Sequence, residues 1–322
     1  MAQIRKTYNW YIERNQKPPS HLKPRGERKT YNWYIQRGLT PPSHLSVPKV
    51  IKGVGHAPVF IPPMVAPAII ETDEQVAERI KVRFSVLETL VADVVQGNVQ
   101  GLIVSGPPGL GKSYTVEQKI KNVENTRIVK GHASAKGLYE LLYDYREEGS
   151  IVVMDDCDSI FTDEKALNLL KTALDTTEER VLSWVTSGPF GASGDDDDGR
   201  SVPTSYVFEG SIIFITNLDF DGMILRQSKI AKHLEALISR CHYIDLLMKS
   251  ARDYVIRIKQ VVRETKMLAS YSPAEVKDVI KFIEDNQPTL REISLRTALK
   301  VATLRKGDKN WQNIAKITCC KI

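Results

Sequence analysis

The sequence contains little cysteine and no long uninterrupted apolar run. Its 322 residues include four cysteines, two of them adjacent at Cys319 and Cys320, and their spacing indicates neither a disulfide framework nor a metal site. A membrane-spanning helix needs roughly 18 apolar residues, and the best candidate, residues 57–70, is interrupted by four prolines. The opening residues form no apolar signal region. We therefore expect a soluble cytoplasmic protein that has no membrane partner.

The net charge of +6 is unevenly distributed along the chain. Residues 1–52 contain eleven Lys or Arg against Glu13 and Glu27, a net charge of +9, so the remaining 270 residues sum to −3. All of the excess positive charge thus lies in an N-terminal extension. Such a segment favours contact with an anionic partner.

The extension contains an internal repeat. Residues 6–22 recur as residues 29–45, with 13 of 17 positions identical. Each copy is typical of a short aromatic helix that ends at a Pro-Pro turn, and it is too short to fold around its own core. Ten of the sixteen prolines fall in residues 1–67, so we interpret residues 53–70 as a linker.

The repeats allow three interpretations. Their aromatic side chains could stack on nucleic-acid bases while Lys and Arg contact phosphates. They could instead dock on a protein partner, used twice so that linkage raises the apparent affinity, or pack on the chain's own globular part. The aromatic residues concerned are Tyr8, Trp10, Tyr11, Tyr31, Trp33 and Tyr34.

From residue 71 onwards, helical patterns alternate with continuous apolar runs. We expect helices over 71–96, 114–123, 137–148 and 164–175, and strands at 102–104, 126–130, 151–154 and 211–216. This alternation predicts an α/β fold whose parallel sheet has helices on both faces. After about residue 247, three or four amphipathic helices follow. The expected organisation is an extension (1–52), a linker (53–70), an α/β core (71–247) and a helical lid (248–322).

A phosphate-binding loop follows the first of these strands. Its pattern is a glycine, four residues, a second glycine, a lysine and a hydroxyl, in which backbone N–H groups cradle phosphates, Lys112 reaches the terminal phosphates and Ser113 binds Mg²⁺. A helix that begins near Lys112 adds its positive dipole end. The expected nucleotide-binding residues are Gly106, Pro107, Pro108, Gly109, Leu110, Gly111, Lys112, Ser113 and Tyr114.

An apolar strand that ends in two carboxylates lies 43 residues after Lys112. In phosphate-loop enzymes the first acid, here Asp155, holds Mg²⁺ together with the loop hydroxyl, and the second, here Asp156, polarises the attacking water. We expect Asp158 to point away from this pair. The cofactors predicted by these residues are ATP and Mg²⁺.

A second apolar strand ends in Thr216-Asn217, and the order of these elements over residues 70–305 resembles the AAA+ ATPases. The resemblance implies that Asn217 orients the attacking water. Ser239-Arg240-Cys241 is similar to the Ser-Arg-Cys element of clamp loaders, which implies that Arg240 is an arginine finger acting on a neighbouring subunit. Arg226 is a weaker candidate, and Ile293-Ser-Leu-Arg296 resembles the sensor-2 segment, in which Arg296 would contact the nucleotide of its own subunit.

A finger acting in trans implies a homo-oligomeric ring, commonly a hexamer in this family. One residue departs from the family pattern. Asp156 stands where the family usually has Glu and is one methylene shorter, so we expect hydrolysis to be slow.

The cargo is suggested by the loop at residues 131–137, which in ring ATPases of this type faces the pore. It contains Lys136 and has no aromatic residue at its tip, although Tyr139 follows shortly after. This composition favours a nucleic-acid backbone over a polypeptide. The acidic run at Asp195–Asp198 is most simply a solvated loop.

The sequence as a whole resembles compact AAA+ ATPases of phages and plasmids. The leading hypothesis is an oligomeric ATPase of DNA metabolism, acting as a translocase, helicase or loader, in the host cytoplasm if phage-encoded. One alternative is a protein-remodelling chaperone of the MoxR or unfoldase type, whose N-terminal repeats would bind a protein partner. Another is an ATP-controlled DNA-binding switch that resembles transposition regulators.

Overall fold

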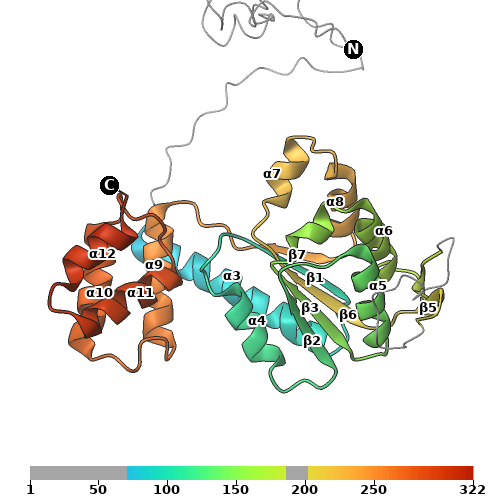
Figure 1. The fold of residues 1–322 in the computed structure, drawn as a ribbon, viewed down its shortest axis with the longest axis horizontal. Coiled ribbons are helices and arrows are strands. Elements are labelled where there is room, and N and C mark those ends of the chain that lie inside the picture. Colours follow the sequence, from blue (N-terminus) through green and yellow to red (C-terminus); the bar gives the residue numbers. More distant parts are fainter. Residues whose placement is uncertain (1–70, 186–201, 322) are drawn as a thin grey trace, which may run out of the picture. The chain divides into compact units, whose positions relative to one another are not determined.

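The centre of the structure, a computed structural model that describes residues 71–185 and 202–321, is a parallel sheet. The strands lie in the order β2-β3-β6-β1-β7, so β6 separates the strand that ends in two carboxylates from the strand that leads into the phosphate loop (Figure 1). Their bounds are β1 (Gly101–Ser105), β2 (Thr126–Lys130), β3 (Ile151–Asp155), β6 (Ser211–Ile215) and β7 (His242–Asp245).

The three central strands are buried along their whole length. Every residue of β1, β3 and β6 is buried, as continuous apolar runs predict for strands that are covered on both faces. Both Val104 and Asp155 lie opposite Ile215 in the register. The carboxyl ends of the three strands are therefore aligned at one edge of the sheet.

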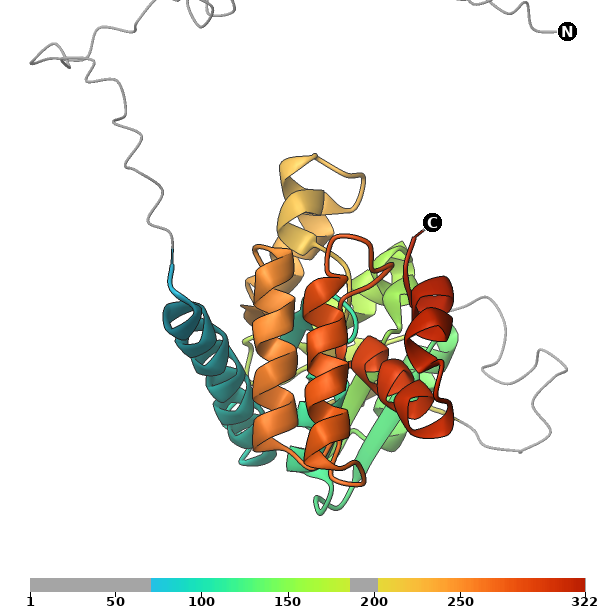
Figure 2. The same ribbon diagram turned by 90° about the vertical axis from the view of Figure 1, so that its left-hand side faces the viewer.

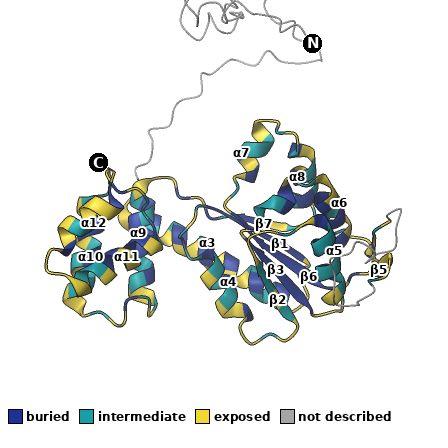
Figure 3. Ribbon diagram, in the orientation of Figure 1, coloured by how far each residue is buried: buried dark blue, intermediate teal, exposed yellow. Residues whose placement is uncertain are grey.

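Helices cover both faces of this sheet (Figures 1 and 3). Strand residues alternate between the two cores, with Val152 in the first and Val153 in the second. The expected α/β fold is confirmed. The first core includes α5 (Ala135–Asp144), α6 (Glu164–Ala173), α7 (Phe220–Leu225), α8 (Ala231–Ile238) and the 3-10 helix η1 (Asp158–Phe161), and the second includes α3 (Asp73–Val95) and α4 (Lys112–Ile120).

A hairpin between α6 and β6 was not predicted. Its strands, β4 (Val181–Ser183) and β5 (Ser205–Val207), pair antiparallel, with Leu182 opposite Tyr206. Each strand has three residues, of which only the middle one is buried, so the alternating pattern is too short to recognise. The acidic run at residues 195–198 lies outside the described residues.

The C-terminal part is helical and has a core of its own (Figure 2). Phe282 packs against Trp311 with 5.6 Å between ring centroids. The last strand ends at Asp245 and the first C-terminal helix begins at Ala251, so the expected change from strands to helices falls between them. The expected domain boundary at residue 247 stays a prediction. None of the described helices has the length and apolar character needed to cross a membrane. The helices here are α9 (Ala251–Glu264), α10 (Pro273–Asp285), α11 (Leu295–Gly307) and α12 (Trp311–Cys319).

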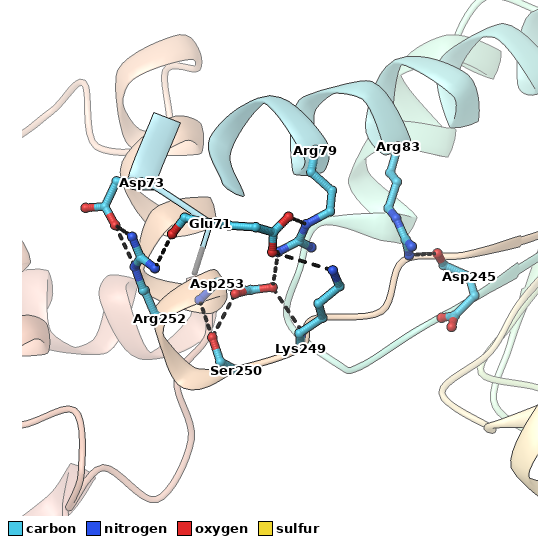
Figure 4. Close-up of polar contacts among 9 residues, drawn as sticks. All are labelled: Glu71, Asp73, Arg79, Arg83, Asp245, Lys249, Ser250, Arg252 and Asp253. Atoms are coloured by element: carbon cyan, nitrogen blue, oxygen red, sulfur yellow. Dashed lines mark hydrogen bonds and ion pairs between the residues drawn. The ribbon is translucent and has the colours of Figure 1, made fainter. Parts of the chain in front are cut away.

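A cluster of polar contacts joins α3 to the start of α9 (Figure 4). Asp253 is 2% exposed. Its carboxylate accepts hydrogen bonds from Arg79 Nη2 (3.0 Å), from the backbone N–H of Lys249 (3.0 Å) and from Ser250 Oγ (2.8 Å). Arg79 also donates two hydrogen bonds to Glu71. One buried carboxylate therefore fixes the first lid helix against α3.

We predict that Asp253→Ala lowers the free energy of unfolding by about 2–3 kcal/mol at pH 7, because it removes the buried partner of Arg79. Burial opposes ionisation of Asp253, but the hydrogen bonds from Lys249, Ser250 and Arg79 outweigh it and lower its pKa below the ordinary 3.8. A lowered pKa contributes stability above the unfolded-state pKa, and this contribution is lost as the pH falls through the folded-state value. Urea unfolding at pH 7 and at pH 3 measures both effects.

Asp73→Ala is the matched control, since Asp73 pairs with Arg252 at the exposed end of the same helix. We expect it to cost less than about 1 kcal/mol. If both variants lose the same free energy of unfolding, Asp253 is not the main contact between α3 and α9. The same conclusion follows if the difference in stability between Asp253→Ala and the parent does not shrink at acid pH.

Candidate nucleotide-binding site

The phosphate loop connects the buried strand β1 to helix α4, which begins at Lys112. Gly109 and Gly111 have φ of +71° and +95°, a backbone conformation that glycine adopts without strain. A Cβ at Gly109 would also lie 2.5 Å from Ser294 Cβ. Both its backbone conformation and the crowding around it therefore require glycine at position 109. Loops whose backbone N–H groups turn towards a phosphate commonly need glycine for these reasons.

Lys112 lies at the centre of the site and is 5% exposed. Its Nζ donates to the carbonyls of Gly106 (2.5 Å) and Pro107 (2.9 Å) and to Oδ1 of Asn217 (2.8 Å). Burial lowers the pKa of Lys112 to about 8, although the charges of Asp156 and Asp155 oppose this shift. The lysine thus stays largely protonated at neutral pH.

The two carboxylates after β3 have different surroundings. Asp155 is buried and accepts a 2.8 Å hydrogen bond from Ser113 Oγ. Asp156 is exposed, has φ of +54°, and accepts a 2.7 Å hydrogen bond from Asn217 Nδ2. Asn217 therefore joins Asp156 to Lys112, and the predicted residues Lys112, Ser113, Asp155, Asp156 and Asn217 are brought together at one edge of the sheet.

Two further charged residues lie at this edge. Asp158 accepts a 2.6 Å hydrogen bond from Thr216 Oγ1, and burial raises its pKa. Lys130 was not predicted as part of the site. Lys130 Nζ lies 3.5 Å from Asp155 Oδ2 and 2.6 Å from Glu117 Oε1. The signal for Lys130 was its position as the last residue of β2, opposite Asp155 in the register.

The remaining loop residues have different surroundings. Leu110 is 2% exposed and packs in the core, whereas Tyr114 is 58% exposed. Pro108 and Tyr114 line a cavity of about 780 Å³ that also borders Lys112 and Asp156. The cavity extends along α3, α4 and α9, so it is larger than the phosphate loop itself.

The lid contacts the phosphate loop directly. The backbone N–H of Leu295, the first residue of α11, donates to the carbonyl of Gly109 at 2.9 Å. Arg296 follows it, lines the same cavity and is close enough for its positive charge to lower the pKa of Lys112. The structure thus places Arg296 at the phosphate end of the cavity.

Arg240 lies at the other end of the sheet. It follows α8 and precedes β7, and its carbonyl is close to Gly101, where β1 begins. Its Nη1 donates to the carbonyl of Ala236 (2.9 Å), and its Nε lies 3.6 Å from Asp175 Oδ1. Within one chain, the structure does not bring Arg240 together with the phosphate loop.

Arg226, the weaker finger candidate, caps α7. Its side chain is 72% exposed and lies 3.8 Å from Asp219.

The candidate nucleic-acid residues are placed only in part. Lys136 was expected in a loop, but α5 begins at Ala135, so Lys136 lies in the first helical turn, 3.5 Å from Glu140. Tyr139 is fully buried and donates to the carbonyl of Pro203, so it does not serve as an aromatic of the preceding loop. The six aromatic residues of the repeats lie outside the described residues.

The fold and the site together define a class. A phosphate loop follows β1, and β6 lies between β1 and the strand that ends in two carboxylates. The asparagine after β6 hydrogen-bonds both to the loop lysine and to the second carboxylate, and a helical lid contacts the loop. The chain has the P-loop AAA+ fold.

A protein of Enterobacteria phage T4, described as an uncharacterized 36.7 kDa protein in the nrdC-mobD intergenic region, is 35% identical over 253 residues. The match covers 76% of this chain and 76% of the phage protein. The chain belongs to the same family as this phage T4 protein. No protein-family model matches the chain.

Solved structures with a similar chain path are distant. A RuvB point mutant of Thermotoga maritima has a TM-score of 0.44 and 14% identity, covering 75% of this chain and 69% of that one. NtrX from Brucella abortus, in complex with ATP, has a TM-score of 0.43 and 13% identity, covering 73% of this chain and 52% of that one. Because these TM-scores and identities are low, the AAA+ fold is assigned from the order of the strands in the sheet and from the geometry of the phosphate loop.

We predict that ATP binds about tenfold more weakly at pH 9 than at pH 7. A phosphate binds the protonated form of Lys112, whose pKa is about 8 without nucleotide, so about nine-tenths of the lysines are neutral at pH 9. Isothermal titration calorimetry across this range measures the effect.

Lys112→Met should bind ATP weakly and without this pH dependence. An affinity that stays constant from pH 7 to pH 9 in the parent protein would contradict the prediction.

Proposed function

We propose that this protein is an oligomeric AAA+ ATPase that hydrolyses ATP at sites between subunits to drive a step of DNA metabolism. The observation that carries the proposal is the hydrogen-bonded chain from Lys112 through Asn217 to Asp156, beside the Ser113–Asp155 pair. This arrangement provides a cation that can bind the phosphates, oxygen ligands that can bind a metal, and a carboxylate that can accept a proton from the attacking water.

The proposed metal is Mg²⁺, and the residues that would hold it are Ser113 and Asp155. A hydroxyl and a carboxylate are hard oxygen donors of the kind that Mg²⁺ prefers. The described residues contain no group of three His, Cys, Asp or Glu placed to hold a metal, which suits an ion that usually takes its other ligands from water and substrate phosphates. When bound, Mg²⁺ would neutralise charge on the phosphates.

Asp156 is the proposed base, and Asn217 positions it. The exposed carboxylate of Asp156 can accept a proton from water, while the amide of Asn217 fixes its direction by a 2.7 Å hydrogen bond. Because aspartate has one methylene fewer than the usual glutamate, its oxygens lie closer to the backbone. We propose that this shorter reach makes hydrolysis slow.

Arg240 is the proposed arginine finger, acting on the nucleotide of a neighbouring subunit. Its position at the amino end of the sheet, away from the Lys112 of its own chain, supports a role in trans. A ring, and specifically a hexamer, is the assembly we propose. The contact with Asp175 keeps Arg240 in place in a single subunit.

The proposed cargo is DNA, with contacts from Lys136 and from the aromatic repeats at Tyr8, Trp10, Tyr11, Tyr31, Trp33 and Tyr34. Burial of Tyr139 supports this, because it leaves the segment before α5 without an aromatic side chain to hold a polypeptide. The phage T4 relative supports a phage setting, and within it we propose a role in replication or recombination in the host cytoplasm. The short Asp156 also suits a second candidate, a DNA-binding switch that ATP assembles and slow hydrolysis releases.

We predict that Arg240→Ala retains ATP binding but loses turnover by about 1,000-fold or more, the usual effect of removing an arginine finger. Steady-state phosphate release and equilibrium ATP binding measure the two quantities. Arg226→Ala is the matched control and should keep its activity.

A mixing experiment tests whether Arg240 acts in trans. Arg240→Ala and Lys112→Met subunits are each expected to be inactive alone. Mixed together they should regain part of the activity, because a Lys112→Met subunit still provides Arg240 to its neighbour. Full activity of Arg240→Ala alone, or no recovery in the mixture although the subunits co-assemble, would contradict the assignment.

We predict that DNA stimulates ATP hydrolysis and that a chain lacking residues 1–52 loses much of this effect, because the net charge of +9 lies there. The ATPase rate is measured with single-stranded DNA, duplex DNA and RNA at several salt concentrations. Stimulation should weaken as salt rises. If no nucleic acid binds or stimulates hydrolysis at moderate salt, both the DNA motor and the DNA-binding switch are wrong, and protein remodelling becomes the better explanation. A strand-displacement assay then distinguishes the motor, which separates strands, from the switch, which does not.

A further inference from the structure

Arg257 is a buried cation in the wall of the nucleotide cavity. It lies in the middle of α9, between the buried residues Ile256 and Ile258, and is itself only 9% exposed. Within the described chain its guanidinium makes no hydrogen bond or ion pair. Its Nε–H is buried without an acceptor, whereas its terminal Nη groups are not fully buried and remain accessible from the cavity. An unpaired buried donor is unfavourable, so the position of this residue needs a physical reason.

Phe84 of α3 holds the guanidinium in place. The guanidinium carbon lies 3.4 Å from the centroid of the Phe84 ring, a cation–π contact that satisfies one face of the group. Burial lowers the pKa of Arg257 to about 10, so it remains charged at neutral pH. The N–H donors lie along the edge of the guanidinium, and the ring does not satisfy them.

The nearest carboxylates do not satisfy them either. Glu264 and Glu88 are close enough for their charges to raise the pKa of Arg257, but neither forms an ion pair with it among the described residues. Glu88 is paired with Lys119 at 3.0 Å. The donors of Arg257 are therefore available to a ligand in the cavity.

Arg257 packs on α3 and not on the phosphate loop, because its guanidinium lies over the ring of Phe84. The charges close to it are those of Glu264 and Glu88, whereas Lys112 lies among Asp155, Asp156 and Arg296. Val261, Met267 and Leu299 add apolar surface to the cavity wall, which is the environment that a planar nucleobase needs.

We propose that Arg257 is the nucleobase-reading residue of this cavity and that the protein therefore binds guanine nucleotides as well as adenine nucleotides. Arginine donates in a fork that matches the adjacent O6 and N7 acceptors of guanine. Adenine presents the N7 acceptor beside an amino donor, so it can use only one arm of the fork. This inference rests on the proposed function, since it assumes that the cavity holds a nucleoside triphosphate.

The test is equilibrium binding of ATP, GTP and ITP to the full chain with Mg²⁺, by isothermal titration calorimetry. ITP keeps the O6 and N7 of guanine but lacks its 2-amino group. For the parent protein we expect the dissociation constants of GTP and ITP to lie within about tenfold of that of ATP. Arg257→Met should weaken GTP and ITP by about 10- to 100-fold and ATP by less than about fivefold.

Two further variants separate base reading from a structural role. Arg263→Met makes the same change at an exposed position of the same helix and should change none of the three affinities. Arg257→Lys keeps the charge but lacks the fork, so it should lose GTP and ITP affinity while keeping ATP affinity.

The outcomes are distinguishable. If the parent binds ATP but not GTP, or if Arg257→Met weakens all three nucleotides equally, the base-reading role is wrong while the proposed ATPase stands. If Arg257→Met weakens GTP but not ITP, the O6 and N7 edge is not what Arg257 reads. If no nucleotide binds the parent at all, the proposed function itself fails.

Discussion

The geometry of the site depends on one side chain, the amide of Asn217. Its oxygen accepts from Lys112 and its nitrogen donates to Asp156, so a single group sets the spacing between the cation and the carboxylate. An aspartate at this position could accept from the lysine but could not donate when ionised, and its charge would repel Asp156. An uncharged group that both accepts and donates meets both demands, and the amide does so from two separate atoms.

Much of this arrangement follows from the sequence, because parallel strands bring their carboxyl ends to one edge. The runs 102–104, 151–154 and 212–215 within β1, β3 and β6 are apolar throughout, and each leads to residues that carry chemistry. Once these runs are interpreted as neighbouring strands, the meeting of Lys112, Asp155, Asp156 and Asn217 needs no further information. The fold class was predictable for the same reason, since continuous burial leaves a clear apolar signal.

Other features depend on tertiary contacts that leave no local pattern. The strands β4, β5 and β7 are short and partly exposed, so they contain no continuous apolar run and any alternation is too short to recognise. Arg257 stands among buried apolar residues of α9, and nothing in the sequence indicates that it stacks on Phe84, more than 170 positions earlier. Its role depends on how the lid packs against α3, which Asp253 and Arg79 determine.

The two buried cations of the cavity differ in what a ligand must displace. Lys112 already has three acceptors within the chain, so a phosphate exchanges one set of hydrogen bonds for another and gains mainly from its charge. Arg257 has no such acceptors in the described chain, so a base that supplies them displaces water from the terminal N–H groups and breaks no hydrogen bond within the protein. We therefore expect the base end of the cavity to contribute more to selectivity between nucleotides, and the phosphate end to contribute mainly to affinity that all nucleoside triphosphates share.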